Sequence, residues 1–458
     1  MRTILANISS GFFARSFLRT DSKKIIEAAN DLRLVLLAPK EKLDYYKKEF
    51  PSPNIIFDEL PDAQRAFGES FFKFIDNSIL HTKTVTYLHK TELYRTGSSA
   101  SIILRLPRYI LRRILWIKGY FAFTRKFFRW LYYLIPSNIF GEIFDKYKPD
   151  LVYCPSMVYD DQLILREAKK RGIKTAGMVL SWDNLYSKTF LRVHPDKLLA
   201  HTSKIKEQAI FCGNYPEDKI VVTGVPQYDR YFQKKGIIPR EEFIKSLGGD
   251  PNKKLVLYAF SGKAGLNIEF DIVDILAKAI KEKELRENVQ VLVRPYPKFD
   301  FGEDRLKKFR EKYGFLAASS MAHIGGGPEA WEFDENALSL LTNSLAHADL
   351  IITMYSTFFI EGAIFDKPLV GVVFDGYQKL NYWNSAKRFF EWDHLKDIGQ
   401  LNGIWMVKSK DEFVKAINGY LINSKYLEEG RRAIVRQQCE FVDGESGARV
   451  AKELLRLL

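Results

Sequence analysis

The segment His347–Val370 (HADLIITMYSTFFIEGAIFDKPLV) holds the densest set of groups suited to chemistry. An apolar run at Leu350–Met354 predicts a buried strand, Tyr355-Ser356-Thr357 a tight turn, and Phe358–Phe365 a helix. Ser356 is placed to cap that helix, so that free N–H groups, hydroxyls and the positive end of the helix dipole meet at the turn. Such a turn predicts an anion site suited to a diphosphate.

A carboxylate follows this predicted phosphate site by one helical turn. Thr357 and Glu361 are four residues apart and therefore share one face of the helix. A carboxylate in that position could accept hydrogen bonds from both hydroxyls of a ribose, which makes the segment a candidate nucleotide site. The alternative interpretation is an ordinary capped helix with a surface glutamate.

Two further segments place small polar residues or cations directly after predicted strands. The loop Ser261-Gly262-Lys263 follows a predicted strand at Lys254–Phe260, and a predicted strand at Val289–Val293 leads to Arg294 and Lys298. Cations neutralise a diphosphate, and a guanidinium does so as a bidentate fork. Arg294 has a structural alternative as an ion-pair partner at the end of its strand.

Activation of an acceptor hydroxyl needs a general base, and the N-terminal half offers several candidates near strand ends. Asp183 follows one apolar run and is the first candidate. Asp160 and Asp161 follow another, and His201 is the fourth candidate. The structural alternatives are that Asp160 or Asp161 caps the helix that begins there, and that Asp183 holds a turn with Asn184.

Residues beside these carboxylates could line a cleft. Ser10 and Gly11 follow the first predicted strand, and Gly11 would allow a ligand to approach closely because it lacks a side chain. Trp182 and Asn184 flank Asp183 and are further cleft candidates. The loop at Ser10 and Gly11 fits an ordinary strand-to-helix turn equally well.

No metal or redox site is expected. Cys154, Cys212 and Cys439 lie too far apart for a CxxC motif, and no Asp-x-Asp pair lies in a metal-like loop. Gly325-Gly326-Gly327-Pro328 resembles a phosphate loop in composition only, because the Lys-Ser/Thr that should follow is missing. The chain is therefore expected to use no cofactor.

A separate aromatic segment, Trp383–Trp392, is a candidate lid or interdomain contact.

Short apolar runs alternate with helices along both halves of the chain, which indicates parallel strands covered on both faces. The predicted fold class is α/β, with two doubly wound Rossmann-like domains facing each other across a cleft. The expected boundaries are 1–235 for an acceptor domain, 236–250 for a linker, 251–440 for a donor domain and 441–458 for a last helix. Ligands in such sheets bind beyond the carboxyl ends of the strands.

The stretch Ser101–Ile135 carries eight basic residues and no acidic ones, so it supplies 8 of the 14 net positive charges. It is predicted to be an amphipathic helical insertion at about 100–136, and basic aromatic segments lie well in the interface of an anionic bilayer. The alternatives are helices packed on the body with solvated arginines, and a nucleic-acid contact that no recognised motif supports. The residues expected at the membrane are Arg105, Arg108, Arg112, Arg113, Trp116, Arg125, Lys126, Arg129 and Trp130.

Five segments, in order and spacing, resemble the GT-B glycosyltransferases. The similarity is to the branch that contains CDP-glycerol glycerophosphotransferases, UDP-GlcNAc 2-epimerases and bacterial capsule or lipopolysaccharide glycosyltransferases. The segments are Ser181–Asn184, Ile220–Tyr228, Tyr258–Lys263, Val291–Pro297 and the strand–Tyr-Ser-Thr–helix–Glu–Lys-Pro pattern that ends at Pro368. The resemblance implies donor-binding roles for Ser261, Gly262, Lys263, Arg294, Lys298, Tyr355, Ser356, Thr357 and Glu361.

One position departs from the family pattern. Tyr296 stands where glycerophosphotransferases and many epimerases carry a histidine, and a tyrosine supplies neither a cation nor a proton near neutral pH. The resemblance therefore favours a metal-independent, inverting glycosyltransferase that moves a sugar from a nucleotide sugar to a lipid-linked or nascent surface polysaccharide. The alternatives are a nucleotide-sugar 2-epimerase or a glycerophosphotransferase of the same fold, and a non-catalytic, membrane-attached subunit of polysaccharide assembly.

Composition and charge limit the location and the partners. A chain that is 46% hydrophobic and 28% charged is not largely disordered, and a net charge of +14 favours an anionic partner. The start, MRTILANISSGFF, has too short an apolar run for a signal peptide, and no uncharged apolar stretch reaches 18 residues. The expected protein is cytoplasmic and peripheral at the inner face of the plasma membrane. Its expected partners are a nucleotide sugar, a glycan acceptor and an anionic membrane surface, without nucleic acid.

Overall fold

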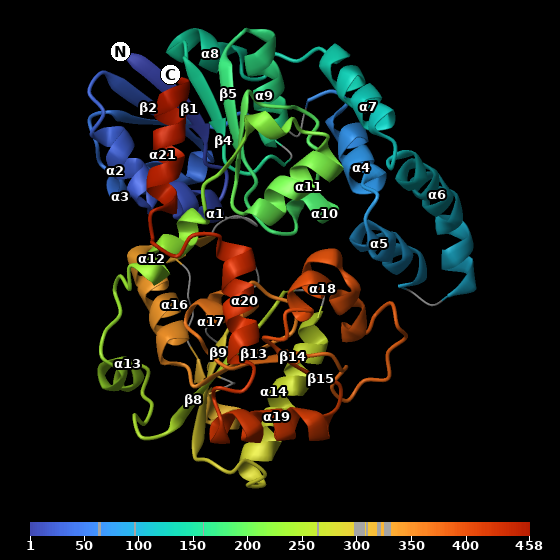
Figure 1. Ribbon diagram of the computed structural model, residues 1–458, viewed down its shortest axis with the longest axis vertical. Helices are drawn as coiled ribbons and strands as arrows, with labels where there is room; N and C mark the ends of the chain where they lie inside the picture. Colours follow the sequence, from blue (N-terminus) through green and yellow to red (C-terminus); the bar gives the residue numbers. More distant parts are fainter. Residues whose placement is uncertain are drawn as a thin grey trace. The chain divides into compact units, whose positions relative to one another are not determined.

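The chain folds into two compact units, shown in the ribbon of Figure 1. The computed structural model describes all residues except 63–65, 96–97, 159, 263–264, 297–306, 308–309, 318–321 and 325–330. The first unit consists mainly of Met1–Asp229 and Gln437–Leu458, and the second unit is formed by the chain between them. The boundary near residue 229 lies close to the expected end of the first domain. The expected linker at 236–250 contains a helix, α13 (Arg240–Ser246), which belongs to the second unit.

The first unit is built on a seven-stranded parallel sheet with the order β3-β2-β1-β4-β5-β6-β7. The order reverses between β1 and β4, which pair in register at Ile4 and Leu151. Loops at the carboxyl ends of these two strands therefore diverge and leave room for a ligand. The strands are β1 (Arg2–Asn7), β2 (Leu32–Ala38), β3 (Ile55–Glu59), β4 (Leu151–Cys154), β5 (Lys174–Met178), β6 (Lys197–Ala200) and β7 (Ile220–Val222).

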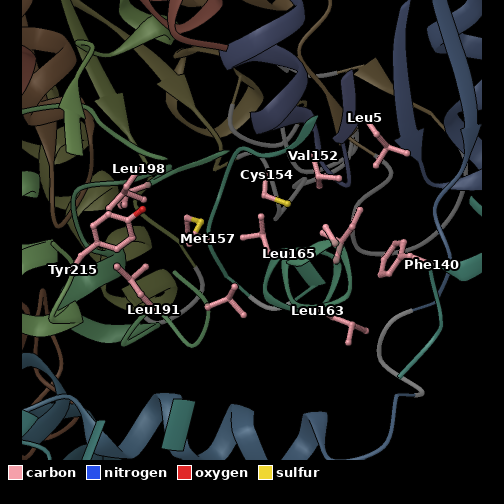
Figure 2. Close-up of a cluster of buried hydrophobic side chains, with 14 of the residues drawn as sticks. Leu5, Phe140, Val152, Cys154, Met157, Leu163, Leu165, Leu191, Leu198 and Tyr215 are labelled. Carbon is pink, nitrogen blue, oxygen red and sulfur yellow. The ribbon is translucent and has the colours of Figure 1, made fainter. Parts of the chain in front are cut away.

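Alternating side chains of this sheet form two separate cores. Leu5, Val35 and Val152 belong to one cluster. Figure 2 shows Leu5 and Val152 in this cluster together with Leu163 and Leu165 of the helix after β4. Their sequence neighbours on the strands belong to the opposite cluster. Because both faces are buried, the strands are continuous apolar runs, as the sequence predicts. The covering helices are α2 (Asp21–Glu27), α3 (Leu43–Glu49), α8 (Gly141–Tyr147), α9 (Asp160–Lys170), α11 (Ser203–Gly213) and α21 (Ser446–Leu457).

The C-terminal helix α21 closes the first unit. Asp229 accepts hydrogen bonds from the backbone N–H groups of Ser446 (3.0 Å) and Gly447 (2.7 Å) at the start of the helix. Ser22 donates to the carbonyl oxygen of Gly447 at 2.7 Å. A Cβ atom at Gly447 would lie 2.8 Å from the Thr20 hydroxyl oxygen, so only glycine allows this close approach. The helix is thus part of the N-terminal core, although more than 200 residues separate it from Asp229.

A helical insertion lies between β3 and β4 and is larger than the sequence suggests. It begins with α4 (Glu69–Ile79) and α5 (Lys83–Tyr94) and continues with α6 (Ser99–Lys118) and α7 (Ala122–Leu134). Figure 1 shows the four helices grouped beside the sheet of the first unit. The expected insertion at 100–136 therefore covers only its second half.

A buried ionic cluster anchors this insertion to the body of the first unit. Arg192, which follows α10 (Asn184–Ser187), is 1% exposed and pairs with Glu69 at 2.7 Å and Asp76 at 3.0 Å, both on α4. Arg166 of α9 lies 3.9 Å from Glu69, and its guanidinium stacks 4.0 Å from the ring of Tyr132 on α7. One cluster of charges therefore joins α4, α7, α9 and the segment before β6.

The second unit repeats the doubly wound plan with six parallel strands in the order β10-β9-β8-β13-β14-β15. Here the order reverses between β8 and β13, which pair in register from Val256 and Leu350. The strands are β8 (Lys254–Ala259), β9 (Val289–Arg294), β10 (Leu316–Ala317), β13 (Leu350–Thr353), β14 (Leu369–Val372) and β15 (Trp405–Val407). An antiparallel pair, β11 (Ala322–His323) and β12 (Trp331–Glu332), is separate from this sheet.

The remaining helices complete the two units. Those whose residues lie in the second unit, besides α13, are α14 (Leu266–Lys281), α16 (Glu335–His347), α17 (Phe358–Ile364), α18 (Asp393–Gly399) and α19 (Lys410–Ile422). The chain passes from one unit to the other within α12 (Asp229–Phe232) and α20 (Glu428–Cys439). Short helical turns are α1 (Gly11–Phe13), the π-helical Ala14–Leu18, and 3₁₀ turns at Lys40–Lys42, Glu217–Lys219, Pro226–Tyr228 and Ala386–Glu391.

Loss of the Arg192 charge is predicted to destabilise the first unit. Arg192→Met keeps the volume of the side chain but leaves Glu69 and Asp76 without their buried partner, which should cost about 3–5 kcal/mol. Arg171→Ala is the matched control, because its ion pair with Asp145 is largely exposed and should contribute about 0–1 kcal/mol. Denaturant midpoints measured with a tryptophan signal test this, and equal midpoints for the two variants would contradict it.

Candidate functional site

The Ser261 hydroxyl joins the two central strands of the second unit at the point where the strand order reverses. Its Oγ accepts the backbone N–H groups of Met354 (3.1 Å) and Tyr355 (3.0 Å) and lies 3.1 Å from the Thr353 hydroxyl. Thr353 donates to the carbonyl oxygen of Ala259 at 2.7 Å, so the Ser261 proton points to Thr353. Two acceptor positions and one proton are then all in use. Ser261 therefore holds the site together, and its hydroxyl has no capacity left for a ligand.

A buried carboxyl group forms a hydrogen bond with the Ser261 backbone beside this contact. Glu269 of α14 is fully buried, and its Oε1 accepts the Ser261 N–H at 2.8 Å. Within the described part of the chain its Oε2 is buried without a hydrogen-bond partner. Burial raises the pKa of Glu269 to about 8, against the opposing effect of the hydrogen bonds from Ser261 and Gly262. The carboxyl is therefore protonated at neutral pH.

The turn after β13 has the predicted form, but its amide groups are paired. Ser356 Oγ accepts the N–H of Phe358, the first residue of α17, at 3.3 Å. The N-cap position itself is Thr357, whose side chain makes no capping hydrogen bond, so the expected cap at Ser356 lies one residue too early. The next amides bond within the turn: Phe359 to the Ser356 carbonyl, and Ile360 and Glu361 to the Thr357 carbonyl. The expected free N–H groups at positions 358–361 are thus not available. The side chains of Ser356 and Thr357 are half-buried, so they are the groups of this turn that a ligand could still reach.

Glu361 lies one turn further along α17 and is 3% exposed. The helix packs tightly on the sheet there, since a Cβ at Gly362 would lie 2.7 Å from Leu369 and 2.8 Å from Ile351. The predicted common face of Thr357 and Glu361 is present, because Glu361 N–H bonds to the Thr357 carbonyl at 2.9 Å. A ribose would have to reach a carboxylate that is largely covered in this structure.

An aromatic wall stands beside the turn. The ring of Tyr355 stacks on Phe389, with centroids 3.8 Å apart and planes 23° apart, and Trp392 meets both rings edge-on. Burial is the main cause that raises the pKa of the Tyr355 phenol, so it stays protonated. Tyr355 also donates to the Gly262 carbonyl at 3.4 Å. The segment Trp383–Trp392, expected to be a lid or interdomain contact, thus packs on the turn of its own unit.

The cationic candidates of this unit differ in placement. Arg294 ends β9 with 4% exposure, and its Nη1 lies 3.5 Å from the Ser344 hydroxyl on α16, so the guanidinium is turned into the unit. Tyr296 is half-buried and lies close enough to Tyr355 to influence its pKa. Lys263, Lys298 and the Gly325–Pro328 loop lie outside the described residues. Gly262 has φ +139°, a conformation that favours glycine.

A second set of polar groups occupies the reversal point of the first sheet. Asp161 accepts the Asn7 side-chain amide at 2.6 Å and, through its other oxygen, the Ser156 N–H (2.8 Å), the Ser156 hydroxyl (2.5 Å) and the Met157 N–H (3.1 Å). This network ties the loops after β1 and β4 together. Burial raises the pKa of Asp161 to about 6, and the Ser156 hydrogen bonds oppose the rise. Asp161 is therefore a structural carboxylate in the first turn of α9, where it binds the loops before the helix rather than capping the helix amides.

The other acidic candidates in the first unit have contrasting surroundings. Asp183 precedes α10 and forms an ion pair with Lys188 at 2.9 Å. Asp160 begins α9 and is half-buried; burial, and then the nearby Glu69 and Asp62 carboxylates, raise its pKa. A raised pKa makes a carboxylate a better proton acceptor, which supports Asp160 as a candidate base.

Further cleft candidates cluster near the same reversal point. Asn184 is buried and donates to the Ser156 carbonyl at 3.4 Å, Ser10 precedes α1 with 9% exposure, and Gly11 is buried; Trp182 is half-buried. His201 follows β6 and is buried, which lowers its pKa to about 4. A histidine that resists protonation so strongly is poorly suited to accept a proton.

Sequence reasoning missed Glu269 and Phe389. The helix α14 begins at Leu266 and places Glu269 next to the Ser261 backbone. Phe389 looks like any aromatic residue of a surface loop. An acidic residue nine positions after the predicted strand Lys254–Phe260 was the signal available for Glu269. In the described part of the chain, no group of three or more His, Cys, Asp or Glu residues is arranged to hold a metal ion.

Comparison with known proteins gives a family and a fold. The family model of CDP-Glycerol:Poly(glycerophosphate) glycerophosphotransferase matches residues 182–456. No curated protein matches the chain. The S. aureus MnaA–UDP co-structure is similar at a TM-score of 0.55 and 12% identity, covering 100% of this chain and 98% of that one. UDP-GlcNAc 2-epimerase from Neisseria meningitidis bound to UDP-GlcNAc gives 0.55 and 11%, with 99% and 100% covered.

A third similar structure comes from another domain of life. UDP-GlcNAc 2-epimerase from Methanocaldococcus jannaschii has a TM-score of 0.53 and 14% identity, and each chain covers 100% of the other. At such identities the likeness concerns the fold alone. It establishes that the two parallel sheets of seven and six strands form a GT-B-like two-domain fold, as the sequence predicts.

The buried Glu269 carboxyl predicts a specific pH dependence of stability. Its pKa of about 8 in the folded protein exceeds the ordinary 4.5, so its contribution is fully present below about pH 4.5 and is lost as the pH rises through 8. Glu269→Gln stays neutral throughout. The stability of the unsubstituted protein relative to this variant should fall by a few kcal/mol from pH 5 to pH 8.5, since each pKa unit is worth about 1.4 kcal/mol.

Denaturant melts of both proteins at several pH values measure this difference. Glu429→Gln, at an exposed glutamate of α20, serves as the control and should give a difference that is flat with pH. A flat difference for Glu269→Gln as well would contradict the assignment of a buried neutral carboxyl.

Proposed function

Since this chain belongs to the CDP-glycerol:poly(glycerophosphate) glycerophosphotransferase family, we propose that it transfers glycerol phosphate, or a closely related polyol phosphate, from a CDP-activated donor to a growing polymer. The observation that carries the proposal is the family match over residues 182–456, which includes nearly all of the second unit. The chain is thus a transferase with a GT-B-like fold, and the donor and acceptor named here are the proposal.

The reaction is a phosphoryl transfer and differs from sugar transfer in the bond that breaks. A hydroxyl of the polymer attacks the phosphorus that carries glycerol, a new phosphodiester forms, and the diphosphate bond of the donor breaks. CMP leaves with the bonding electron pair, and the acceptor proton passes to a base. A glycosyltransferase would instead break a bond at the sugar carbon and release a nucleoside diphosphate. The leaving nucleotide therefore distinguishes the two reactions.

The reversal point of the second sheet is the proposed donor site. Ser356 and Thr357 present their hydroxyls there, and Glu361 lies one turn behind them. Gly262, in a conformation that favours glycine, leaves the loop after β8 open to a close approach. The expected cations Arg294, Lys263 and Lys298 would neutralise the phosphates. In this role Arg294 would need to turn from its contact with Ser344 toward the donor.

Asp160 is the proposed general base, with Asp183 as the second candidate. Asp160 lies at the reversal point of the first sheet, and burial raises its pKa, which makes it a better proton acceptor than an exposed carboxylate. Asp183 is already engaged by Lys188 at 2.9 Å.

A second candidate function follows from a single residue. Tyr296 stands at the position where glycerophosphotransferases carry histidine, and a phenol that stays protonated cannot replace an imidazole as a proton donor or acceptor near pH 7. This departure favours transfer of a sugar from a nucleotide sugar, with the same turn holding its diphosphate. The acceptor would then be a surface glycan such as capsule or lipopolysaccharide.

The polymer acceptor suggests where the enzyme works. We place it at the inner face of a plasma membrane as a peripheral protein, because its net charge of +14 suits an anionic surface. In the described residues, no helix combines the length and the apolar character needed to cross a bilayer.

Product analysis is predicted to separate the two candidate reactions. With CDP-glycerol and a poly(glycerol phosphate) acceptor, the enzyme should release CMP, measured by anion-exchange chromatography. Glu361→Gln should slow this release at least about tenfold through loss of a charged hydrogen-bond acceptor, whereas Glu429→Gln on the exposed face of α20 should not. Release of a nucleoside diphosphate from a nucleotide sugar, without CMP from CDP-glycerol, would replace the proposal with sugar transfer.

Substitution of the two acids is predicted to rank them. Asp160→Asn should lower the transfer rate by about 10²–10⁴-fold while CDP-glycerol still stabilises the protein in a thermal-shift assay. Asp183→Asn should reduce the rate less than about tenfold, because the carboxylate it removes is engaged by Lys188. The reverse ranking would identify Asp183 as the base.

A further inference from the structure

The outer face of α6 and α7 is the most apolar exposed surface in the described part of the protein. The described residues include 24 exposed large hydrophobic side chains, and 13 of these lie between Ile103 and Leu134. Leu104 is 82% exposed, Phe123 68% and Trp130 57%. We call the exposed side chains Leu104, Ile110, Ile117, Phe123, Phe127 and Trp130 the apolar ridge. Exposed apolar surface of this extent marks a site of interaction with a partner or a membrane.

Several cations of the segment point away from this face. Arg129 is 8% exposed and donates to the carbonyl oxygens of Leu191 and Phe190, both at 2.8 Å. Arg125 is buried and donates to Asn214 Oδ1 at 2.6 Å and to the Gly119 carbonyl. Arg112 is buried and pairs with Glu92. Their guanidinium groups, expected to meet lipid phosphates, are occupied by the protein because helix ends and loops offer them unpaired carbonyl oxygens.

Two further residues expected at the membrane also bind within the unit. Trp116 stacks on His81 with centroids 3.7 Å apart and donates its indole N–H to the Thr82 carbonyl at 2.9 Å. Arg113 lies 4.0 Å from the Trp116 ring and donates to the Thr86 hydroxyl. These contacts hold α6 against α5. The part of the apolar ridge on α6 is therefore carried by a helix that is fixed within the unit.

The charges that do remain exposed are positive. Arg108, Lys118 and Lys126 are exposed, although Arg108 also lies 3.5 Å from the Glu92 carboxylate of α5, and no acidic residue occurs from Ser99 to Ile135. Arg105 is half-buried and donates to the Glu92 carbonyl at 3.0 Å. The face is thus apolar and aromatic with a few cations, a composition that suits the headgroup region of an anionic bilayer. A second copy of the same face would instead bring like charges together.

We propose that the apolar ridge inserts into the headgroup region of an anionic membrane, with burial of apolar side chains as the main source of binding and Arg108, Lys118 and Lys126 as a secondary one. The inference rests on the proposed location of the enzyme at a membrane, but not on the identity of its donor. It differs from binding by a basic patch, in which salt would remove most of the affinity.

Vesicle flotation with the full chain tests the two sources of binding separately. Vesicles of phosphatidylcholine with about a third phosphatidylglycerol are compared with pure phosphatidylcholine, at low and high salt. Leu104→Gln/Phe123→Gln/Trp130→Gln should weaken binding to the anionic vesicles at least about tenfold at both salt concentrations. Arg108→Gln/Lys118→Gln/Lys126→Gln should keep binding and lose only the few-fold preference for anionic lipid. Ile422→Gln/Val442→Gln, which removes equally exposed apolar groups elsewhere, should bind normally.

Three results would overturn the inference. Loss of binding in the cation variant alone would mean that the contact is electrostatic. Unchanged binding in the ridge variant would mean that another surface meets the lipid. A wild-type protein that ignores both vesicles but is dimeric by light scattering, and becomes monomeric in the ridge variant, would mean that the ridge binds a second copy. CMP release measured without vesicles shows independently whether the proposed reaction holds.

Discussion

The hydroxyl of Ser261 is the contact on which the second unit's candidate site depends. It connects the ends of β8 and β13, the two strands between which the sheet changes direction, and it does so with every hydrogen bond a hydroxyl can make. The turn that carries Ser356 and Thr357, the ring of Tyr355 and the wall formed by Phe389 all take their positions from that joint. Glu269 holds the joint from inside the unit as a neutral acid. The polar groups at this strand reversal therefore stabilise the fold, and only those with hydrogen-bonding capacity left can also bind a ligand.

Much of the architecture was predictable from the sequence because buried parallel strands are continuous apolar runs. The predicted strands Lys254–Phe260 and Val289–Val293 agree with β8 and β9 to within one residue, and the turn at Tyr355 was found from its strand–turn–helix pattern. What could not be predicted depends on contacts between distant segments. Arg125 and Arg129 look like surface cations in a basic helix, yet backbone carbonyls more than 60 residues away, of Phe211 at the end of α11 and of Leu191, accept hydrogen bonds from them. The amides of α17 likewise appeared free, because their pairing depends on the detailed path of the turn.

Family and fold carry different kinds of information here. The GT-B-like fold, shared with epimerases at 11–14% identity, explains why two strand reversals exist and where ligands can approach them. The family match is the basis for proposing a reaction at a phosphorus atom rather than at a sugar carbon. Tyr296 is the position at which this sequence departs from the family pattern. A tyrosine stands there in place of a histidine, while the preceding strand matches the pattern.

The docking of α21 on Asp229 has a consequence for how the protein is made. All six strands of the second sheet lie on one uninterrupted stretch of chain, so that sheet can assemble as soon as this stretch leaves the ribosome. Most of the first unit emerges before this stretch, but the amides of Ser446 and Gly447 can reach Asp229 only after the whole second unit has been synthesised. Until then part of the apolar surface that Val450, Ala451 and Leu454 later cover stays open to water. The first unit is therefore completed only after the second.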